Sequence, residues 1–429
     1  MEFLFTFSSK IRQFPGNMKS TNEQKIFISA IIGNILEFYD LALYGVYASQ
    51  FANLFFPSQN SIHSMIFSWL AFATGLFSRP LGSLFFGFIG DHYGRKKALF
   101  SSIFLMSLST FFIGVLPDFS IWGIAAPIML FFLRFIQGFS VGGESNGSAI
   151  FALEHSNNEN LGFKGAIILA SSVLGALLAI FSSLLLHSYE NSWRISFIFG
   201  SLIGLVGLYI RKSLPEVSNL IIQQELPSKK SISQHLVNSL ANFPREISLI
   251  IFLGAINGSL YYTLFAYSNY HFLKVMHYSY STSLSLMAFG MTCFVIFLIV
   301  TGYFAESIGY RKILQKTCVA ILLLIVPCFY LLNMKGLVFS LSAMILLAAL
   351  TAGVGAPLHA FMLDLFPPNV RYLSVSLGFN LGIAIFGGAA PTIMTWLSKQ
   401  PYSFFLSSLY SFCISSVTLL LLSKNAKKR

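Results

Sequence analysis

Charged residues are scarce in this sequence. Asp, Glu, Lys and Arg make up 10% of its 429 residues, whereas 55% are hydrophobic and the mean hydropathy is +0.73. Soluble domains carry about 25% charged residues, so this composition excludes one. Strand-like alternation of apolar and polar residues is also missing, which excludes a membrane barrel. The chain has instead runs of about 20 apolar residues, enough for a helix to cross a bilayer. The sequence therefore predicts an all-α membrane protein.

Motifs for nucleotide, metal or covalent chemistry are absent too. The sequence has no phosphate-binding glycine loop and no pairing of a nucleophile with a base. We therefore expect neither an enzyme nor a pump with its own ATPase domain, and neither a cofactor nor a metal. Four cysteines fall within apolar segments and lack the spacing of metal ligands: Cys293, Cys318, Cys328 and Cys413.

Twelve apolar segments are long enough to be transmembrane helices. A polar stretch with three prolines separates the first six from the last six. The predicted helices are centred near residues 38, 75, 107, 134, 174, 202, 260, 292, 321, 350, 382 and 412. The expected divisions are an N-terminal cytoplasmic tail at 1–25, a six-helix bundle at 26–211, a cytoplasmic central loop at 212–246, a second six-helix bundle at 247–422 and a basic cytoplasmic tail at 423–429.

The net charge of +12 follows from the topology. If both termini lie on one side of the membrane, most of the 27 Lys and Arg residues fall in loops and tails on that side. Basic residues mark the cytoplasmic side, so we expect both termini in the cytoplasm. The charge therefore indicates no nucleic-acid partner. Only four basic residues fall in the opposite loops: Arg194, Lys274, Lys335 and Lys399.

The two halves share a repeated motif. The segment "GDHYGRKK" follows the second predicted helix and "AESIGYRK" follows the eighth, so that Asp91 corresponds to Glu306. Parallel repeats of this kind place a substrate site between the halves, near the middle of the bilayer.

The residues of the two motif copies predict a charged contact on the cytoplasmic side. Such a contact holds the two halves together and releases them during alternating access. Topology alone requires the basic residues but neither Asp91 nor Gly94. The predicted gating residues are Gly87, Asp91, Gly94, Arg95, Lys96, Lys97, Glu306 and Arg311.

Five ionisable residues lie inside predicted helices of the first half: Glu37, Asp40, Arg79, Arg134 and Glu144. Each costs about 2.5–3.5 kcal/mol in a membrane, so intramembrane charges usually serve function. Three acids against two bases leave one carboxylate without a formal partner. Burial favours the neutral form of such an acid, which makes it a candidate for binding a proton. The alternative is that Arg79 or Arg134 pairs with an acid only to fix helix register.

Polar residues on the same helices extend this cluster. Asn34, Glu37, Asp40 and Tyr44 are spaced to share one helix face, and Gln137 precedes Glu144 by two turns. We expect these residues to bind the proton or the substrate. The glycines of the fourth helix, in contrast, are expected to serve close helix packing: Gly138, Gly142, Gly143 and Gly147.

The second half offers polar and aromatic residues in place of charges. We take Asn257, Tyr261, Tyr262 and His359 as substrate candidates. Tyrosine faces suit a quaternary ammonium group through cation–π attraction. A hydrogen-bonded core histidine is an equally good interpretation of His359.

Three segments in order carry a family resemblance: "GNILEFYDLALYG" at 33–45, "SRPLGSLFFG" at 78–87 and "RFIQGFSVGGE" at 134–144. With the twelve helices and the repeated loop motif, they resemble the bacterial metabolite:proton symporters of the major facilitator superfamily. That family includes proline/glycine-betaine and α-ketoglutarate transporters. One departure concerns the fourth-helix acid Glu154, which is followed by Leu161 where the family usually has an arginine, although Arg371 is kept in the second half.

The resemblance implies proton-coupled uptake of a small zwitterion, such as proline or betaine, by alternating access. The coupling ion is the proton, the location is a bacterial inner membrane, and we expect a monomer in the lipid bilayer. Two arginines, Arg79 and Arg134, would instead suit a di- or tricarboxylate. A passive facilitator and a receptor without transport are further alternatives, the second supported only by Leu161.

Overall fold

The structure is a computed structural model that describes residues 21–93, 95–142, 149, 152–154, 156, 160–189, 191–212 and 242–424. Helices dominate these residues, and none of them forms a strand. Every predicted helix centre falls within an observed helix. The predicted all-α fold with two sets of six membrane crossings is therefore confirmed.

Among the described residues, the first six crossings comprise seven helices. A break splits the second crossing into α3 and α4, and the short α6 lies between the third and fourth crossings. Their bounds are α2 (Thr21–Phe55), α3 (Ser61–Phe77), α4 (Arg79–Tyr93), α5 (Arg95–Val115), α6 (Phe119–Trp122), α7 (Ala125–Val141), α9 (Leu161–Leu186) and α10 (Ser192–Lys212).

The last six crossings contain three π-helical segments, named η1 to η3. The bounds are α13 (Pro244–Tyr262), η1 (Thr263–Tyr267), α14 (Ser268–Tyr270), η2 (His271–Val275), α15 (Tyr280–Ile308), α16 (Tyr310–Asn333), α17 (Leu337–Leu365), α18 (Pro368–Gly382), η3 (Ile383–Gly387), α19 (Ala390–Leu397) and α20 (Ser403–Lys424).

Length and composition fit a membrane-spanning chain. Within the described residues, eight helical stretches are long and apolar enough to cross a membrane, and the apolar parts of α5 and α7 form two shorter ones. The helices α2 and α10 complete the twelve crossings.

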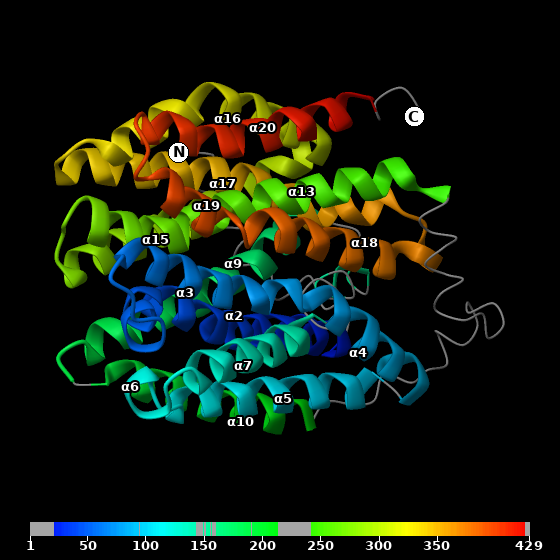
Figure 1. Cartoon of the computed structure of the whole chain (residues 1–429). Coiled ribbons are helices and arrows are strands. Elements are labelled where there is room, and N and C mark those ends of the chain that lie inside the picture. The colour runs from blue at the N-terminus through cyan, green and yellow to red at the C-terminus, as the bar shows by residue number, and fades with distance from the viewer. Residues whose placement is uncertain are drawn as a thin grey trace.

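The helices of the two halves form two neighbouring groups with roughly parallel axes (Figure 1). Helix α9 packs against both α15 and α17 of the second half, α3 packs against α19, and α4 packs against α18. The interface between the halves therefore runs along the whole length of the helices. It is the place where the repeat predicts a substrate site.

Glycines allow two equivalent helix crossings to come unusually close. A Cβ atom on Gly175 of α9 would lie 2.2 Å from the carbonyl oxygen of Ile35 on α2. In the second half, a Cβ atom on Gly382 would lie 2.0 Å from the carbonyl oxygen of Ile251 on α13. Both are contacts between the first and fifth crossings of a half, so the internal repeat extends to helix packing.

The fourth crossing uses glycines in the same way. A Cβ atom on Gly138 would lie 1.6 Å from the carbonyl oxygen of Gly75, and one on Gly142 would lie 1.9 Å from that of Arg79. The predicted packing role is therefore seen for these two glycines, whereas Gly143 and Gly147 lie outside the described residues. This contact brings α7 against the junction of α3 and α4.

That junction is a break at Ser78, which the sequence analysis did not predict. Pro80 has no backbone N–H to donate to the carbonyl of Leu76, so the helix ladder is interrupted there. Arg79 consequently begins the next helix, and its side chain is buried.

Replacing Gly138 by alanine is expected to destabilise the fold, because the added methyl group collides with backbone. Overpacking of this kind costs about 1–3 kcal/mol. The measurement is the thermal unfolding midpoint of the purified protein in detergent. Gly165→Ala is the matched control, since its Cβ atom would lie 3.3 Å from a side-chain atom of His359. Equal midpoints for the two variants would contradict this view of the α3–α7 contact.

Candidate functional site

Glu37 and Arg79 form a buried ion pair between α2 and α4. Their nearest atoms, Oε1 of Glu37 and Nη2 of Arg79, are 3.9 Å apart, and both side chains are at most 5% exposed. This distance is too long for a hydrogen bond. The Nε and Nη2 atoms of Arg79 have no hydrogen-bond partner within the described structure. The pair therefore leaves donor capacity on Arg79 for another anion.

Asp40 and Arg134 are joined through an intervening amide. The Oδ2 atom of Asp40 accepts a hydrogen bond from Nε2 of Gln137 at 2.8 Å, and Oε1 of Gln137 accepts one from Nη1 of Arg134. The hydroxyl group of Thr110 on α5 also donates to Asp40. The charge on Asp40 is thus linked to Arg134 without direct contact between the two groups.

The guanidinium group of Arg134 lies between aromatic rings. Its central carbon is 4.5 Å from the ring centre of Tyr44 and 5.5 Å from that of Phe72, in cation–π contact with both. Its Nε and Nη2 atoms have no hydrogen-bond partner among the described groups. Tyr44 donates its own hydroxyl to the carbonyl of Ser68 at 3.0 Å, which fixes the ring.

Asn34, the remaining candidate on α2, contacts a different helix. Its side-chain amide donates to the carbonyl of Ile168 on α9 at 3.2 Å. The structure therefore brings together Glu37, Asp40 and Tyr44 with the two arginines, and it turns Asn34 toward α9. Glu144 lies outside the described residues.

Aromatic residues of the second half close over this cluster. Tyr261 meets Phe38 of α2 edge to face with ring centres 6.2 Å apart, and Tyr262 meets Phe72 at 5.3 Å. Phe265 lies beside Gly45, where an added Cβ atom would come within 2.6 Å of its ring. The charges of the first half thus face aromatic side chains of the second half.

The other two candidates of the second half lie further along the interface with α9. Asn257 sits beside Gly355 of α17, and its Oδ1 atom has no hydrogen-bond partner in the described part of the chain. His359 is one turn beyond Gly355, and its Cβ atom faces Gly165 of α9. The arrangement supports Asn257 as a polar group at the interface and leaves His359 close to the α9 backbone.

Contacts between the halves occur at one end of the helices through Glu306 and Arg371. Oε1 of Glu306 accepts from the backbone N–H of Gly162 at 2.5 Å, while the hydroxyl of Tyr310 donates to its Oε2 at 3.0 Å. Arg371 and Glu154 form an ion pair at 2.6 Å. Two acids, one from each half, therefore bind donors on the opposite half.

Other members of the predicted gating set behave differently. Arg311 donates its Nε to the carbonyl of Leu422, a contact inside the second half. Gly87 and Asp91 belong to α4, and the three basic residues open α5. Gly94 lies outside the described residues, as do the side chains of Asp91, Arg95, Lys96 and Lys97.

At the opposite end, the halves are joined by two further hydrogen bonds. The Nδ2 atom of Asn269 donates to the carbonyl of Val46 at 3.3 Å, and the hydroxyl groups of Ser183 and Tyr280 are 2.6 Å apart. The central cluster is thus covered at both ends. Glu37, Asp40, Arg79 and Arg134 are each at most 4% exposed, as expected for an occluded conformation.

Sequence reasoning missed three contributors to the site. Thr110 and Phe72 are ordinary residues for an apolar helix and gave no signal. Asn380 of α18 is 1% exposed and donates across the interface to Ser83 of α4 at 3.2 Å, with its own Oδ1 atom unpartnered in the described structure. A buried asparagine in a predicted helix was the signal that should have selected it.

The fold and this enclosed charge cluster define a polytopic membrane transporter. A profile of the Major Facilitator Superfamily matches residues 30–374, and the chain belongs to that superfamily. The matched relatives are transporters and not enzymes, which confirms that expectation.

Similar proteins include the glycine betaine/proline/ectoine/pipecolic acid transporter of Dickeya dadantii, which is 32% identical over 420 residues, covering 92% of this chain and 82% of that protein. The proline/betaine transporter of Escherichia coli strain K12 is 30% identical over 415 residues, with the same coverage. Among solved structures, the xylose transporter of E. coli in a partially occluded inward-open conformation has a TM-score of 0.75 at 15% identity, covering 95% of this chain and 98% of that one. The structural match supports the fold.

Replacing Gln137 by leucine is expected to destabilise the protein, because Arg134 and Asp40 each lose a buried hydrogen-bond partner. Leaving such groups unpaired costs about 1–3 kcal/mol or more. The thermal unfolding midpoint should fall well below that of Gln315→Leu, which removes only a half-buried amide bonded to Leu422. In a double-mutant cycle, the effects of Asp40→Asn and Gln137→Leu on the free energy of unfolding should be non-additive. Additive effects would contradict the hydrogen-bonded link from Asp40 through Gln137 to Arg134.

Proposed function

We propose that the chain is a proton-coupled importer of a small zwitterion of the proline or betaine type, working by alternating access. One observation carries this proposal: a buried cluster of two acids and two arginines faces aromatic side chains of the other half. A zwitterion needs both an anion-binding and a cation-binding group, and this cluster offers both. The names of the relatives, proline/betaine transporters among them, support the same substrate class.

Arg79 is the proposed partner of the substrate carboxylate. It lies at the junction of α3 and α4, its contact with Glu37 is long, and two of its nitrogens have no hydrogen-bond partner within the described residues. A carboxylate accepts two parallel hydrogen bonds from one guanidinium group. When a substrate takes this place, Glu37 loses part of its interaction with Arg79.

The ammonium end of the substrate is proposed to lie against Tyr261, Phe38 and Phe265. These rings come from both halves and are within stacking distance of one another, with Tyr261 and Phe265 6.0 Å apart. A cation over such rings gains about 0.5–2 kcal/mol. Since the rings belong to different halves, the bound substrate would hold the halves together in the occluded state.

Asp40 is the proposed proton site, because its surroundings satisfy both of its protonation states. As a carboxylate, it accepts hydrogen bonds from Thr110 and Gln137. As an acid, it donates to the oxygen of Thr110, and the Thr110 hydroxyl turns to the carbonyl of Met106, 3.0 Å away. Glu37 instead pairs with Arg79 at 3.9 Å. These contacts support Asp40 over Glu37 as the proton site, a choice that the sequence left open.

The remaining elements of the proposal concern topology and assembly. We place the protein in a bacterial inner membrane as a monomer with both termini in the cytoplasm, and we keep the bundle boundaries at 26–211 and 247–422. No cofactor besides the coupling proton is required. The contacts of Glu306 and Arg371 then lie at the cytoplasmic end, where they close the inward route.

A second candidate function is symport of a di- or tricarboxylate. It is favoured by the unpartnered nitrogens of both Arg79 and Arg134 in the described cluster. The receptor hypothesis, in contrast, loses its support. It depended on the missing arginine at Leu161, and the neighbouring N–H of Gly162 binds Glu306 without it.

The substrate class is tested by a thermal-shift screen of the purified protein. Proline and glycine betaine are expected to raise the unfolding midpoint, since a ligand at 100 times its Kd stabilises by about 2.7 kcal/mol. α-Ketoglutarate and citrate should have no effect. Arg79→Gln should abolish the shift, whereas Lys335→Gln, which removes an exposed cation, should preserve it. A shift with the carboxylates alone would favour the second function.

The proton site is tested by Asp40→Asn in proteoliposomes. Asparagine keeps the size of the neutral acid but has no proton to exchange, so counterflow of substrate should continue while uptake driven by a proton gradient is lost. Asp118→Asn is the control, because Asp118 caps the short α6 through Ser120. Normal accumulation by Asp40→Asn, combined with failure of Glu37→Gln, would move the proton site to Glu37.

A further inference from the structure

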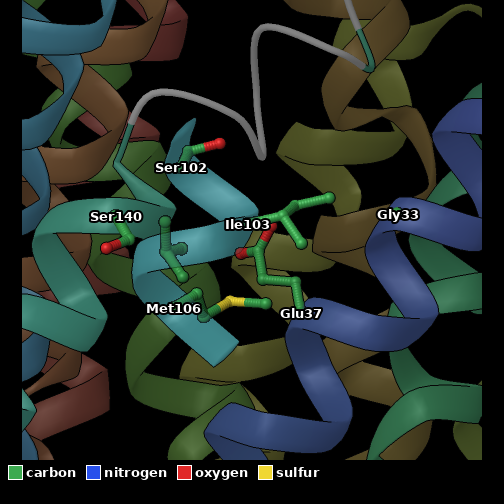
Figure 2. Close-up of a pocket in the computed structure, with 7 residues that line it drawn as sticks. Gly33, Glu37, Ser102, Ile103, Met106 and Ser140 are labelled. Carbon is green, nitrogen blue, oxygen red and sulfur yellow. The ribbon is translucent and has the colours of Figure 1, made fainter. Parts of the chain in front are cut away.

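A small cavity lies inside the first six-helix bundle (Figure 2). Among the described residues, its walls come from α2, α5 and α7, and none of the aromatic residues at the interface between the halves lines it. The volume is about 10 Å³, which is room for one water molecule. The main lining residues are Gly33, Glu37, Ser102, Met106 and Ser140.

Polar groups make this cavity suitable for water. Figure 2 shows Glu37 reaching from α2 toward α5, with its carboxyl end beside Ile103. The hydroxyl groups of Ser102 and Ser140 belong to residues that are 2% and 1% exposed. Ser140 donates to the carbonyl of Ile136 at 2.7 Å, which leaves its oxygen able to accept from a water molecule. Cavities with two to four polar partners hold ordered water, whereas apolar ones stay dry.

The cavity neighbours the proposed proton site along α2 and α5. Ser102, Met106 and Thr110 follow one another at four-residue intervals on α5, so they share one face. Thr110 bonds Asp40 and also the carbonyl of Met106. On α2, Glu37 precedes Asp40 by three residues, which puts their Cβ atoms about 5–6 Å apart. Glu37 is therefore the group that both neighbours Asp40 and lines the cavity.

The cavity also lies on the side of Asp40 that we assign to the cytoplasm. Gly33 precedes Asp40 on α2, Ser102 precedes Thr110 on α5, and Ser140 follows Gln137 on α7. Helices α2 and α5 run in the direction opposite to α7. The steps from Asp40 to Gly33, from Thr110 to Ser102 and from Gln137 to Ser140 therefore all lead toward the same end of the bundle. This is the end at which α4 gives way to α5.

We propose that this cavity is a water site through which the coupling proton leaves for the cytoplasm, on a route inside the first bundle that is separate from the substrate route between the halves. The proposal rests on the proposed function. The O–H bond of Asp40 breaks and its proton passes to the Glu37 carboxylate. Glu37 then passes it to the cavity water, which gives it to bulk water. Asp40 keeps the electron pair and ends as a carboxylate, and Glu37 ends as it began.

Separate routes have a functional consequence. The substrate needs the Glu306 and Arg371 contacts to open, whereas a proton needs only a chain of hydrogen-bonded groups. Polar residues on the interface, Ser83 and Asn380, mark the substrate side, and they lie on α4 and α18. Changes in the cavity should therefore affect proton movement and leave substrate exchange intact.

The test removes the two serine hydroxyl groups and compares two kinds of transport. In proteoliposomes, Ser102→Ala/Ser140→Ala should lower the initial rate of substrate-driven proton uptake by about tenfold, the effect of one lost hydrogen bond in the rate-limiting step. Counterflow of labelled proline or betaine, which needs no net proton movement, should stay within about twofold of the parent.

One further variant guards against misfolding. Ser109→Ala removes a buried hydroxyl of the same helix that, among the described residues, bonds the carbonyls of Leu105 and Met106, and it should leave both rates unchanged. Parent-like proton uptake in the double alanine variant would overturn the proposal, and so would an equal loss of proton uptake and counterflow.

A second measurement needs no transport. X-ray radiolysis oxidises side chains that touch bound water, so Met106 should be oxidised in the parent and protected in the double alanine variant, as read by mass spectrometry. Equal oxidation in both would overturn the water site. Met106 could be oxidised in the parent protein while that protein shows no counterflow of proline or betaine. The proposed function would then fail and the water site would stand, so the two failures are distinguishable.

Discussion

Glu37, Asp40, Arg79 and Arg134 are buried between helices of one bundle, and the cost of keeping ionised groups away from water governs the rest of the site. Each such group must find a partner, because an isolated charge in a low-dielectric interior is strongly unfavourable. Glu37 meets Arg79, and Asp40 reaches Arg134 through Gln137. These contacts tie α2 to α4 and α7, so the electrostatic requirement also sets the relative positions of three membrane helices.

The hydrogen-bond network is nevertheless incomplete among the described residues, which favours the proposed binding role over one in helix register alone. A cluster that served only helix register would satisfy every donor, since unsatisfied buried groups lower stability. Both arginines keep two nitrogens without hydrogen-bond partners in the described structure, and both are almost fully buried. Glycine packing at Gly138 and Gly142 holds the arginine-bearing helices together at backbone distance. The fold thus holds these donors in place without allowing them to reach water, as the proposed substrate site requires.

Hydropathy was sufficient to predict the twelve crossings, because a chain in lipid must satisfy its backbone within each helix. The break at Ser78 and the three π-helical segments were not predictable in the same way. They depend on local interruptions of the backbone hydrogen bonding within a helix and on packing. Buried charges were found from the sequence because their cost makes them stand out. Thr110 and Phe72 were not found, because threonine and phenylalanine are common in membrane helices and only the fold brings them to Asp40 and Arg134.

The contact of Glu306 shows a further limit of reading side chains alone. The absence of an arginine at Leu161 suggested a weakened gate, yet Leu161 begins α9 and the next residue offers a backbone N–H to Glu306. The first N–H groups of a helix have no partner within the helix, and the helix dipole favours a carboxylate there. An arginine side chain can swing away from its partner, whereas a backbone N–H moves only with its helix. Release of Glu306 therefore requires α9 to shift against α15, so in the proposed mechanism this contact couples opening of the proposed cytoplasmic end to rigid movement of the two halves.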